Sequence, residues 1–239
     1  MAIASSRSQK ESLFTKVIMA EKTILSSNQK KILLLLSREP QISGNFYLTG
    51  GTALAEFYLH HRLSEDLDFF SEKEFDPQAV FIIFSKLKKA AGIKKIDFQQ
   101  SFNRNLYFLE LSSGETIKTE FTYFPFPEIE KRKKIDGILV DGLLDIAVNK
   151  IFTVYQKPRA RDFIDLYFIA QKTGWTIGEL VKKARIKFDW HIDPLQLGSQ
   201  FMSAVEARDY PRMIKKIDQK TWQDFFIQEA KKLGKNIFE

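Results

Sequence analysis

The stretch that most constrains the fold runs from Phe46 to Phe70 and reads FYLTGGTALAEFYLHHRLSEDLDFF. The apolar segments at its two ends predict short strands, and the segment between them predicts a helix over residues 52–61. The apolar face of that helix consists of Leu54, Phe57, Tyr58 and His61. The chain therefore passes from a strand through a glycine pair into a helix, and returns in a second strand that carries two aspartates.

The glycine pair, Gly50–Gly51, precedes Thr52 at the start of the helix. Free backbone N–H groups at a helix N-terminus bind phosphate, and glycine leaves no Cβ in the way. Thr52 adds a hydroxyl donor to this predicted phosphate site. The structural alternative is a tight turn in which Thr52 is an ordinary helix cap.

Asp66 and Asp68 flank one residue of the second strand, so their side chains point to the same face, about 6 to 7 Å apart between Cα atoms. Two carboxylates at that spacing repel each other unless a cation or a proton intervenes. Carboxylates, waters and substrate phosphates together form the octahedron that Mg²⁺ prefers. The alternative is a solvated strand end. Arg62 and Ser64 are candidate donors to the same substrate.

A third carboxylate is expected on a neighbouring strand. In TIKTEFTYF, Glu120 alternates with apolar residues and lies on the polar face. Glu110 is the rival, although it lies near a hairpin turn and among apolar residues of its own strand. An exposed Glu120 without a role at the site is the structural alternative.

The remaining pattern predicts an α+β chain in two parts. Residues from about 8 to 38 and 77–91 are expected to be helical. Residues 112–115 are expected to join two of the later strands in a hairpin, and the basic run 131–134 is expected to be a loop. The later strands are KKIDFQQ, NLYFLELSS, ETIKTEFTYF and the short GILV. We predict a mixed α/β domain with N-terminal helices over 1–140 and an all-helical domain over 141–239.

Three separated segments, LTGGTALA, HRLSEDLDFF and RDFIDLYFIA, resemble the AbiEii/AbiGii family. Members of that family are toxins of bacterial type IV toxin–antitoxin and phage-abortive systems, with the polymerase β-like nucleotidyltransferase fold. The resemblance covers about residues 45–170. It is specific because all three segments occur in the same order.

The resemblance assigns roles residue by residue. Gly51 and Thr52 would hold the triphosphate of a nucleotide, with Gly50 beside them, and Asp66 and Asp68 would ligate Mg²⁺. Lys150, which would bind and neutralise the phosphates, and the RDxxDL motif, whose Asp162 or Asp165 would fix Lys150 or orient a substrate hydroxyl, complete the expected catalytic set. The segment KIFTVYQKPRARD departs from the family pattern, since Tyr155 and Gln156 stand where many relatives carry an arginine. Arg159 and Arg161 are the alternatives for that role.

The residues themselves support this second group. Nearly every position from Phe163 to Ala170 is apolar, which predicts a helix buried on most sides. Asp162 and Asp165 share its one polar stripe, and buried carboxylates need partners. Lys150 is the expected partner. A purely structural ion pair is the alternative, and the sequence leaves open which aspartate faces the site.

Composition limits the cofactors and partners. The chain has no cysteine and only three scattered histidines, so a zinc site is not expected, and His61 is expected to pack against the core. A chain without cysteine fits a reducing cytoplasm, and no apolar run is long enough to span a membrane. The net charge of +7 favours RNA weakly.

The resulting hypothesis is Mg²⁺-dependent transfer of a nucleotidyl group from an NTP. The acceptor would be an RNA 3′ end, such as that of tRNA, or a protein hydroxyl, and a cognate antitoxin would be the partner. The alternative is a catalytically silent nucleotide-binding or protein-interaction module on the same fold.

Overall fold

The computed structural model of the chain describes residues 23–238. The predicted N-terminal helix therefore lies partly outside the described residues, and its described part is α2 (Ser27–Ser37). Helix α2 begins at a capping box, in which the Ser26 hydroxyl accepts from the Gln29 N–H and the Gln29 side chain accepts from the Ser26 N–H. A short helix that the sequence analysis missed, α3 (Pro40–Asn45), follows it. Pro40 occupies the first turn of α3, where a missing N–H costs nothing.

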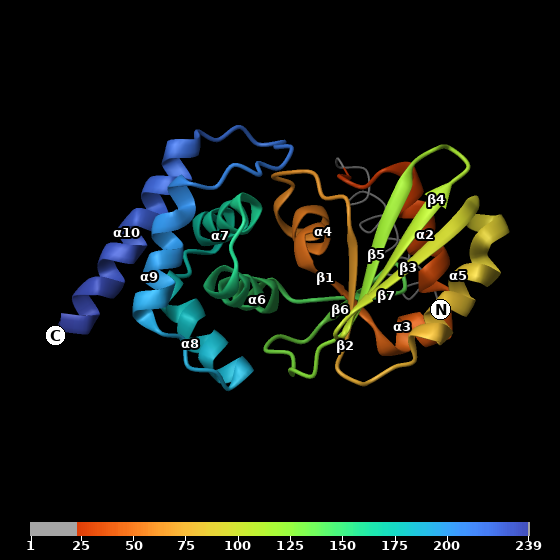
Figure 1. The fold of residues 1–239 in the computed structure, drawn as a ribbon, viewed down its shortest axis with the longest axis horizontal. Helices are drawn as coiled ribbons and strands as arrows, with labels where there is room; N and C mark the ends of the chain where they lie inside the picture. Colours follow the sequence, from red (N-terminus) through yellow and green to blue (C-terminus); the bar gives the residue numbers. More distant parts are fainter. Residues whose placement is uncertain (1–22, 239) are drawn as a thin grey trace, which may run out of the picture.

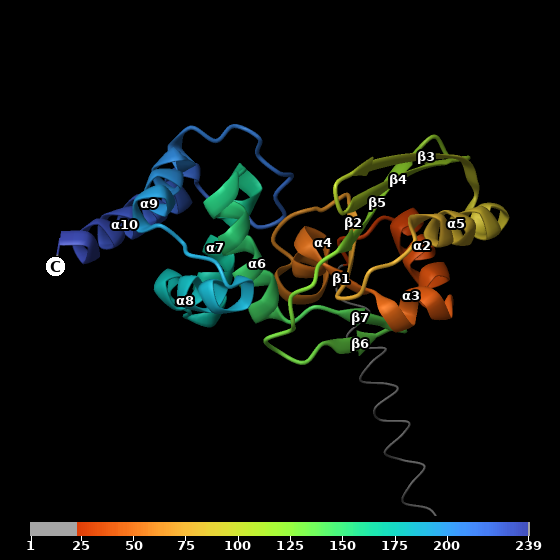
Figure 2. The same ribbon diagram turned by 60° about the horizontal axis from the view of Figure 1, so that its bottom comes forward.

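Seven strands form one mixed sheet, in the order β3-β4-β5-β2-β1-β7-β6. They are β1 (Tyr47–Thr49), β2 (Leu67–Ser71), β3 (Ile93–Ser101), β4 (Arg104–Leu111), β5 (Thr116–Tyr123), β6 (Lys133–Ile135) and β7 (Ile138–Val140). Figure 2 shows β3, β4 and β5 at one end of the sheet and β6 and β7 at the other. The predicted strands are confirmed, as is the hairpin turn between β4 and β5. The basic run 131–134 is not wholly a loop, because β6 pairs with β7 and contains Lys133 and Lys134.

The centre of the sheet combines antiparallel and parallel pairs. Strands β1 and β2 are antiparallel, whereas β2 pairs with β5, and β1 with β7, in parallel. The parallel pair places Asp68 of β2 directly beside Glu120 of β5. Alternation along the strands separates two faces: Leu67 and Phe69 are fully buried, while Asp68 and Phe70 are partly exposed on the other face.

The predicted helix over 52–61 is only partly right. Helix α4 (Gly50–Leu54) continues as one π-helical segment (Ala55–Leu59), which ends at His60 in the left-handed region. The His60 N–H bonds to the Ala55 carbonyl, five residues back. His61 is therefore not on the helical face. The chain turns after His60, so that His61 and Arg62 point inward to a buried aspartate.

Helices cover the sheet on both sides (Figure 1). Helices α2, α3 and α5 (Pro77–Ala91) lie on one side. The helical half lies on the other, with α4 between it and the sheet. Helix α5 has the predicted ends, with the Asp76 carboxylate capping the Gln78 N–H and Gly92 in the left-handed region after its last turn.

The helical half contains α6 (Leu143–Gln156), α7 (Ala160–Thr173), α8 (Ile177–Phe188), α9 (Pro194–Met202), a 3₁₀ turn (Ser203–Val205) and α10 (Gln219–Phe238). Phe163 of α7 packs against Trp222 and Phe226 of α10, so the last helix closes the core of this half. The prediction of helix to the chain end is wrong over 206–218, which is mostly irregular. There Met213 pairs with Arg62, and the Leu63 N–H bonds to the Arg212 carbonyl.

The α+β fold class is confirmed. All seven strands precede Asp141, and all of the described chain after it is helix or loop. The division into two domains at residue 140 stays a prediction. None of the described helices is both long enough and apolar enough to cross a membrane.

Candidate active site

One cavity of about 550 Å³ brings together most of the predicted site residues. It is lined from the sheet by β2 and β5 and from the helical half by α6 and α7. The predicted residues that line it are Gly50, Gly51, Arg62, Ser64, Asp66, Asp68, Glu120, Lys150 and Asp162. Arg159 and Arg161, the alternatives considered for a basic ligand, also line it. Thr52 and Asp165 do not.

The two glycines are required by close contacts. Gly50 has φ +71°, and a Cβ at this position would overlap the Asp68 carboxylate. A Cβ on Gly51 would lie 2.5 Å from Nη2 of Arg62 and 3.1 Å from the Ser64 hydroxyl. The absence of side chains here lets the backbone at the start of α4 approach both the carboxylate and the cavity.

Thr52 lies in the first turn of α4 and is buried. Its hydroxyl donates to the backbone carbonyl of Asp66, so it ties α4 to the start of β2 and does not face the cavity. The interpretation of Thr52 as the helix cap is also wrong. Thr49 occupies the N-cap position, and its own hydroxyl donates to Asp141 at 2.8 Å.

The three carboxylates come from neighbouring strands. Asp66 immediately precedes β2, and Asp68 lies beside Glu120 across the parallel β2–β5 pair. Burial raises the pKa of Asp68 to about 7, with smaller contributions from the charges of Glu120 and Asp66. Glu110 is exposed on β4 and does not line the cavity. Position therefore distinguishes Glu120 from its rival.

Two basic residues that the sequence analysis did not single out meet these carboxylates. The Lys118 ammonium lies 2.7 Å from Oδ2 of Asp66. The Arg104 guanidinium forms a two-point contact with Glu120, at 2.7 and 2.6 Å. Lys118 precedes Glu120 by two residues on β5, so the same alternation that selected Glu120 also places Lys118 on this face. That signal was present in the sequence. Arg104 depends on the pairing of β4 with β5.

The fit to a metal ion rests on chemistry rather than on a preformed cage. Among residues 23–238, no three acidic, histidine or cysteine side chains are arranged to enclose a metal ion. Mg²⁺ commonly uses only one or two carboxylates, and completes its octahedron with waters and substrate phosphates. The Asp68 carboxylate also has no ion-pair or hydrogen-bond partner within the described part of the chain. A divalent cation would relieve the repulsion that contributes to its raised pKa.

Asp165 and Lys150 are the centre of a buried ion cluster. The Asp165 carboxylate receives Nε and Nη2 of Arg62 at 2.6 and 2.8 Å, Nε2 of His61 at 2.8 Å, and the Lys150 ammonium at 2.9 Å. Lys150 also contacts Asp162 at 2.7 Å. Both aspartates are fully buried, but Asp162 and Lys150 line the cavity, whereas Asp165 does not. Of the two aspartates, Asp162 is therefore the one that faces the site.

The cluster fixes the charge of its members. Burial by itself would raise the pKa of Asp165, but Lys150 and Arg62 outweigh it and hold that pKa well below the usual value. Burial opposes a charged Lys150, yet Asp165 and Asp162 raise its pKa. Burial lowers the pKa of His61, which favours a neutral imidazole. Arg62 lines the cavity but is committed to Asp165, so its predicted role as a free donor to substrate does not match its contacts.

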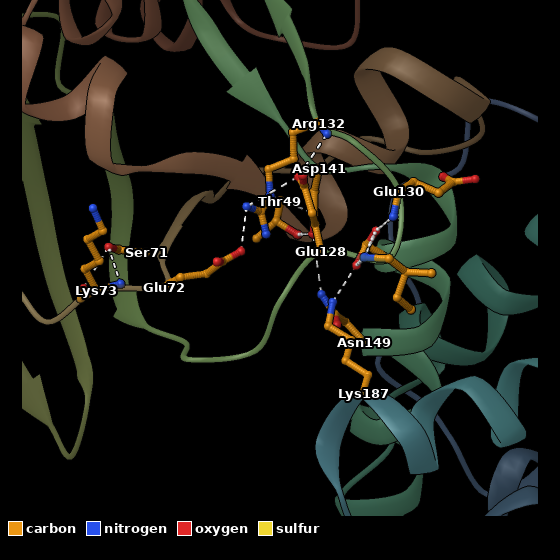
Figure 3. Close-up of polar contacts among 12 residues, drawn as sticks. Thr49, Ser71, Glu72, Lys73, Glu128, Glu130, Arg132, Asp141, Asn149 and Lys187 are labelled. Carbon is orange, nitrogen blue, oxygen red and sulfur yellow. Dashed lines mark hydrogen bonds and ion pairs between the residues drawn. The ribbon is translucent and has the colours of Figure 1, made fainter.

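A second buried network lies behind the cavity, around Asp141 (Figure 3). Thr49 and Arg132 contact Asp141 at 2.8 and 3.2 Å, and Arg132 also pairs with Glu72 at 2.7 Å and lies 3.5 Å above the Tyr47 ring. Burial raises the pKa of Asp141 to about 6, with Asp145 adding to the effect. The network clamps β1 to β7 and the loop before β6, and so supports the strand end from which the glycine turn begins.

Aromatic side chains form part of the cavity wall. Phe70, Phe124, Phe126, Phe152 and Phe188 all line it. Gln156, one of the departures from the family pattern, lines it as well, whereas Tyr155 is buried in the core. The sequence analysis assigned the aromatic residues mostly to the core, because spacing alone does not separate a core face from a cavity wall.

Comparisons with known proteins point to one family. A family model described as the nucleotidyl transferase AbiEii toxin of type IV toxin–antitoxin systems matches residues 34–229. An Aquifex aeolicus (strain VF5) protein described as uncharacterised is 35% identical over 151 residues, which make up 62% of this chain and 68% of that protein.

Two solved structures share the fold. JHP933 from Helicobacter pylori superposes with a TM-score of 0.58 at 20% identity, covering 89% of this chain and 94% of that chain. The nucleotidyltransferase toxin MenT4 from Mycobacterium tuberculosis H37Rv superposes with a TM-score of 0.59 at 19% identity, covering 86% and 81%. At these identities the likeness establishes the architecture, while the family match extends over most of the chain.

Proposed function

Because the chain belongs to the AbiEii nucleotidyltransferase toxin family of type IV toxin–antitoxin systems, we propose that its cavity binds an NTP with Mg²⁺ and transfers the nucleotidyl group to an acceptor hydroxyl. The observation that carries the proposal is the convergence of the Gly50–Gly51 turn with Asp68 and Glu120 on one cavity. Either element alone has an ordinary structural explanation. Together they combine a phosphate-binding backbone with ligands for a divalent cation.

In this proposal Asp68 would be the central carboxylate ligand of Mg²⁺, with Asp66 or Glu120 as the neighbouring ligands and waters and substrate phosphates completing the octahedron. When bound, the ion would lower the pKa of the acceptor hydroxyl and neutralise the pyrophosphate. The hydroxyl gives up its proton to water, and its oxygen forms a bond to the α-phosphorus while the bond from that phosphorus to the bridging oxygen breaks, so that pyrophosphate leaves. The chain itself contributes mainly position and charge.

The remaining residues divide between substrate contacts and support. The backbone of Gly50 and Gly51 and the Ser64 hydroxyl face the phosphate end, where Lys118 and Arg104 bring positive charge. Lys150 lines the cavity but contacts both Asp162 and Asp165. We therefore assign Lys150, Asp162, Asp165 and Arg62 to positioning the loop after α4 against α6 and α7. Thr52 acts in the same way, through the carbonyl of Asp66.

For the acceptor we propose an RNA 3′ end, such as that of tRNA, because the net charge of +7 favours a polyanion over a protein hydroxyl. Membership of a type IV toxin–antitoxin family makes a cognate antitoxin the expected protein partner, and the lack of cysteine fits a cytoplasmic location.

A second candidate function is nucleotide binding without turnover. The ion pairs Lys118–Asp66 and Arg104–Glu120 favour it, since each neutralises a proposed metal ligand from within the chain. Turnover requires that Mg²⁺ either displace Lys118 and Arg104 from these carboxylates or share the carboxylates with them.

The two candidates are separated by incubating the protein with each α-labelled NTP, Mg²⁺ and total RNA. The proposal expects transfer of label to RNA in the wild type, loss in Asp66→Ala, Asp68→Ala and Glu120→Gln, and retention in Glu110→Gln. Glu110→Gln is the matched control because Glu110 is on the neighbouring strand outside the cavity. Nucleotide binding without any transfer to RNA or protein supports the silent module. Equal transfer by folded wild type and both aspartate variants rejects the proposed metal ligands.

A further inference from the structure

We infer that the aromatic end of the cavity is a subsite for the nucleobase of the bound NTP. The inference rests on the proposed function, because it takes the phosphate end of the same cavity as the place where the triphosphate lies. Phe70, Phe124, Phe126, Phe152 and Phe188, here called the phenylalanine wall, line the cavity. Phe70 and Phe124 lie beyond Asp68 and Glu120 along β2 and β5, in the direction away from the glycine turn. Nothing in the proposed chemistry at the carboxylates uses these five rings.

The wall is continuous and spans both halves of the chain. Ring centroids are 4.8 Å apart between Phe70 and Phe124, 4.9 Å between Phe124 and Phe126, and 4.9 Å between Phe126 and Phe188. Phe152 of α6 stacks on Phe188 of α8 at 4.3 Å. Four of the five rings are only partly buried, although they belong to a connected cluster. Their open surface faces the cavity.

The wall lies at a distance from the carboxylates that suits a nucleotide. Phe70 is the next residue after Asp68 on the same face of β2, and Thr122 and then Phe124 follow Glu120 along β5. Two residues of strand span about 6.6 Å. Phe70 is therefore about 6.6 Å along the strand from the paired carboxylates Asp68 and Glu120. A ribose spans a similar distance between its 5′-phosphate and its base.

The loop that carries two of the rings is held in place before any ligand binds. Phe124 and Phe126 alternate with prolines in FPFP, and proline fixes φ at two positions. The Phe124 N–H bonds to the Ser71 carbonyl at 2.7 Å, and the Phe126 N–H bonds to the Phe124 carbonyl at 2.8 Å. A fixed aromatic surface binds a planar ring with little entropic cost, because few side-chain or loop motions remain to be lost.

A nucleobase is the occupant that these features favour. Its flat π-face stacks on phenylalanine, whereas a flexible aliphatic chain gains no such contact. Gln156, one turn beyond Phe152 on α6, is exposed and also lines the cavity. Its amide carries both donors and an acceptor, so it can pair with the edge of a base that stacks on the wall.

The test compares a nucleotide with a probe that lacks the base. In the same Mg²⁺ buffer, isothermal titration measures the affinities of the four NTPs and of inorganic tripolyphosphate for the full-length protein. We expect the best NTP to bind more tightly than tripolyphosphate in the wild type. Phe126→Ala should weaken NTP binding about tenfold, equivalent to about 1.4 kcal/mol, and leave tripolyphosphate binding unchanged. Phe126→Tyr, which retains the ring, should restore NTP binding.

Phe98→Ala is the matched control, because Phe98 is a partly buried phenylalanine of β3 that packs on Tyr107 outside the cavity. Circular dichroism confirms that each variant is folded, and Phe152→Ala provides a second position on the wall. Equal affinity for NTP and tripolyphosphate, unaffected by either wall substitution, overturns the subsite while leaving the phosphate site intact. Wall variants that lose affinity for an RNA oligonucleotide but not for NTP place an acceptor base there and also overturn it. Failure of both NTP and tripolyphosphate to bind would instead reject the proposed function.

Discussion

Replacing Asp165 by asparagine tests whether the buried cluster holds the protein together or takes part in chemistry. The side chain is fully buried and receives Arg62 twice, His61 once and Lys150 once, all within 2.9 Å. Asparagine has nearly the same shape, but it offers one acceptor oxygen, and its NH₂ group would face cations. Lys150 would keep its ion pair with Asp162, while Arg62 would lose the one ion pair that it makes within residues 23–238.

Removing one partner of a buried ion cluster costs about 3 to 5 kcal/mol, because the charges left behind are neither paired nor hydrated. For a chain of this size, about 2 to 4 °C of melting temperature is lost per kcal/mol. We therefore expect Asp165→Asn to melt roughly 6 to 20 °C below the wild type. The folded pKa of Asp165 is lowered, so its stabilisation is present above the ordinary aspartate pKa and disappears as pH falls through the folded value.

Urea denaturation followed by circular dichroism at pH 7 measures the free energy of unfolding of both proteins. Glu65→Gln is the matched control, since Glu65 pairs with Arg212 on the surface, where both side chains are more than two-thirds exposed. It should cost less than about 1 kcal/mol. If Asp165→Asn unfolds within 1 kcal/mol of the wild type yet loses activity, the structural reasoning is refuted and Asp165 acts in the reaction.

Three further predictions concern the site and its support. Without metal, the free energy of unfolding of Asp68→Asn in urea should exceed that of the wild type by about 2 kcal/mol at pH 8 and equal it near pH 4, whereas equal values at pH 8 contradict this. The reason is that a carboxyl group with a raised pKa in the folded protein destabilises it as pH rises from about 4 to 7. Gly50→Ala should lower the free energy of unfolding by at least about 1 kcal/mol and abolish the thermal stabilisation by Mg²⁺ and NTP, since Gly50 has φ +71° and an added Cβ would meet Asp68. Gly44→Ala, where an added Cβ meets open space, should retain that thermal stabilisation. Lys187→Met should lower the free energy of unfolding in urea by about 2 to 3 kcal/mol, because it leaves the buried Asp145 carboxylate without its ion-pair partner at 2.6 Å. An equal loss in Lys183→Met, an exposed position of the same helix, would show that helix propensity and not the ion pair is responsible.

Local pattern was sufficient for the elements that carry the site. The glycine pair, the alternation of Asp66 and Asp68 in an apolar run, and the polar face of Glu120 each follow from the spacing of neighbouring residues. The helix over 52–61 was assigned too far. Its periodicity continues to His61, but the helix ends at His60, and His61 and Arg62 turn inward to contact a carboxylate about 100 positions later.

The amino-acid sequence by itself determined where carboxylates, glycines and apolar side chains occur around each strand, because these are local properties. Only the tertiary structure decided their partners. Parallel pairing of β2 with β5 put Glu120 beside Asp68, pairing of β4 with β5 brought Arg104 to Glu120, and packing of α7 under the loop after α4 enclosed Asp165 among cations. These contacts join positions from 16 to more than 100 residues apart. The charge states and pKa values of these side chains depend on burial and on distances in space, and the spacing of residues along the chain specifies neither.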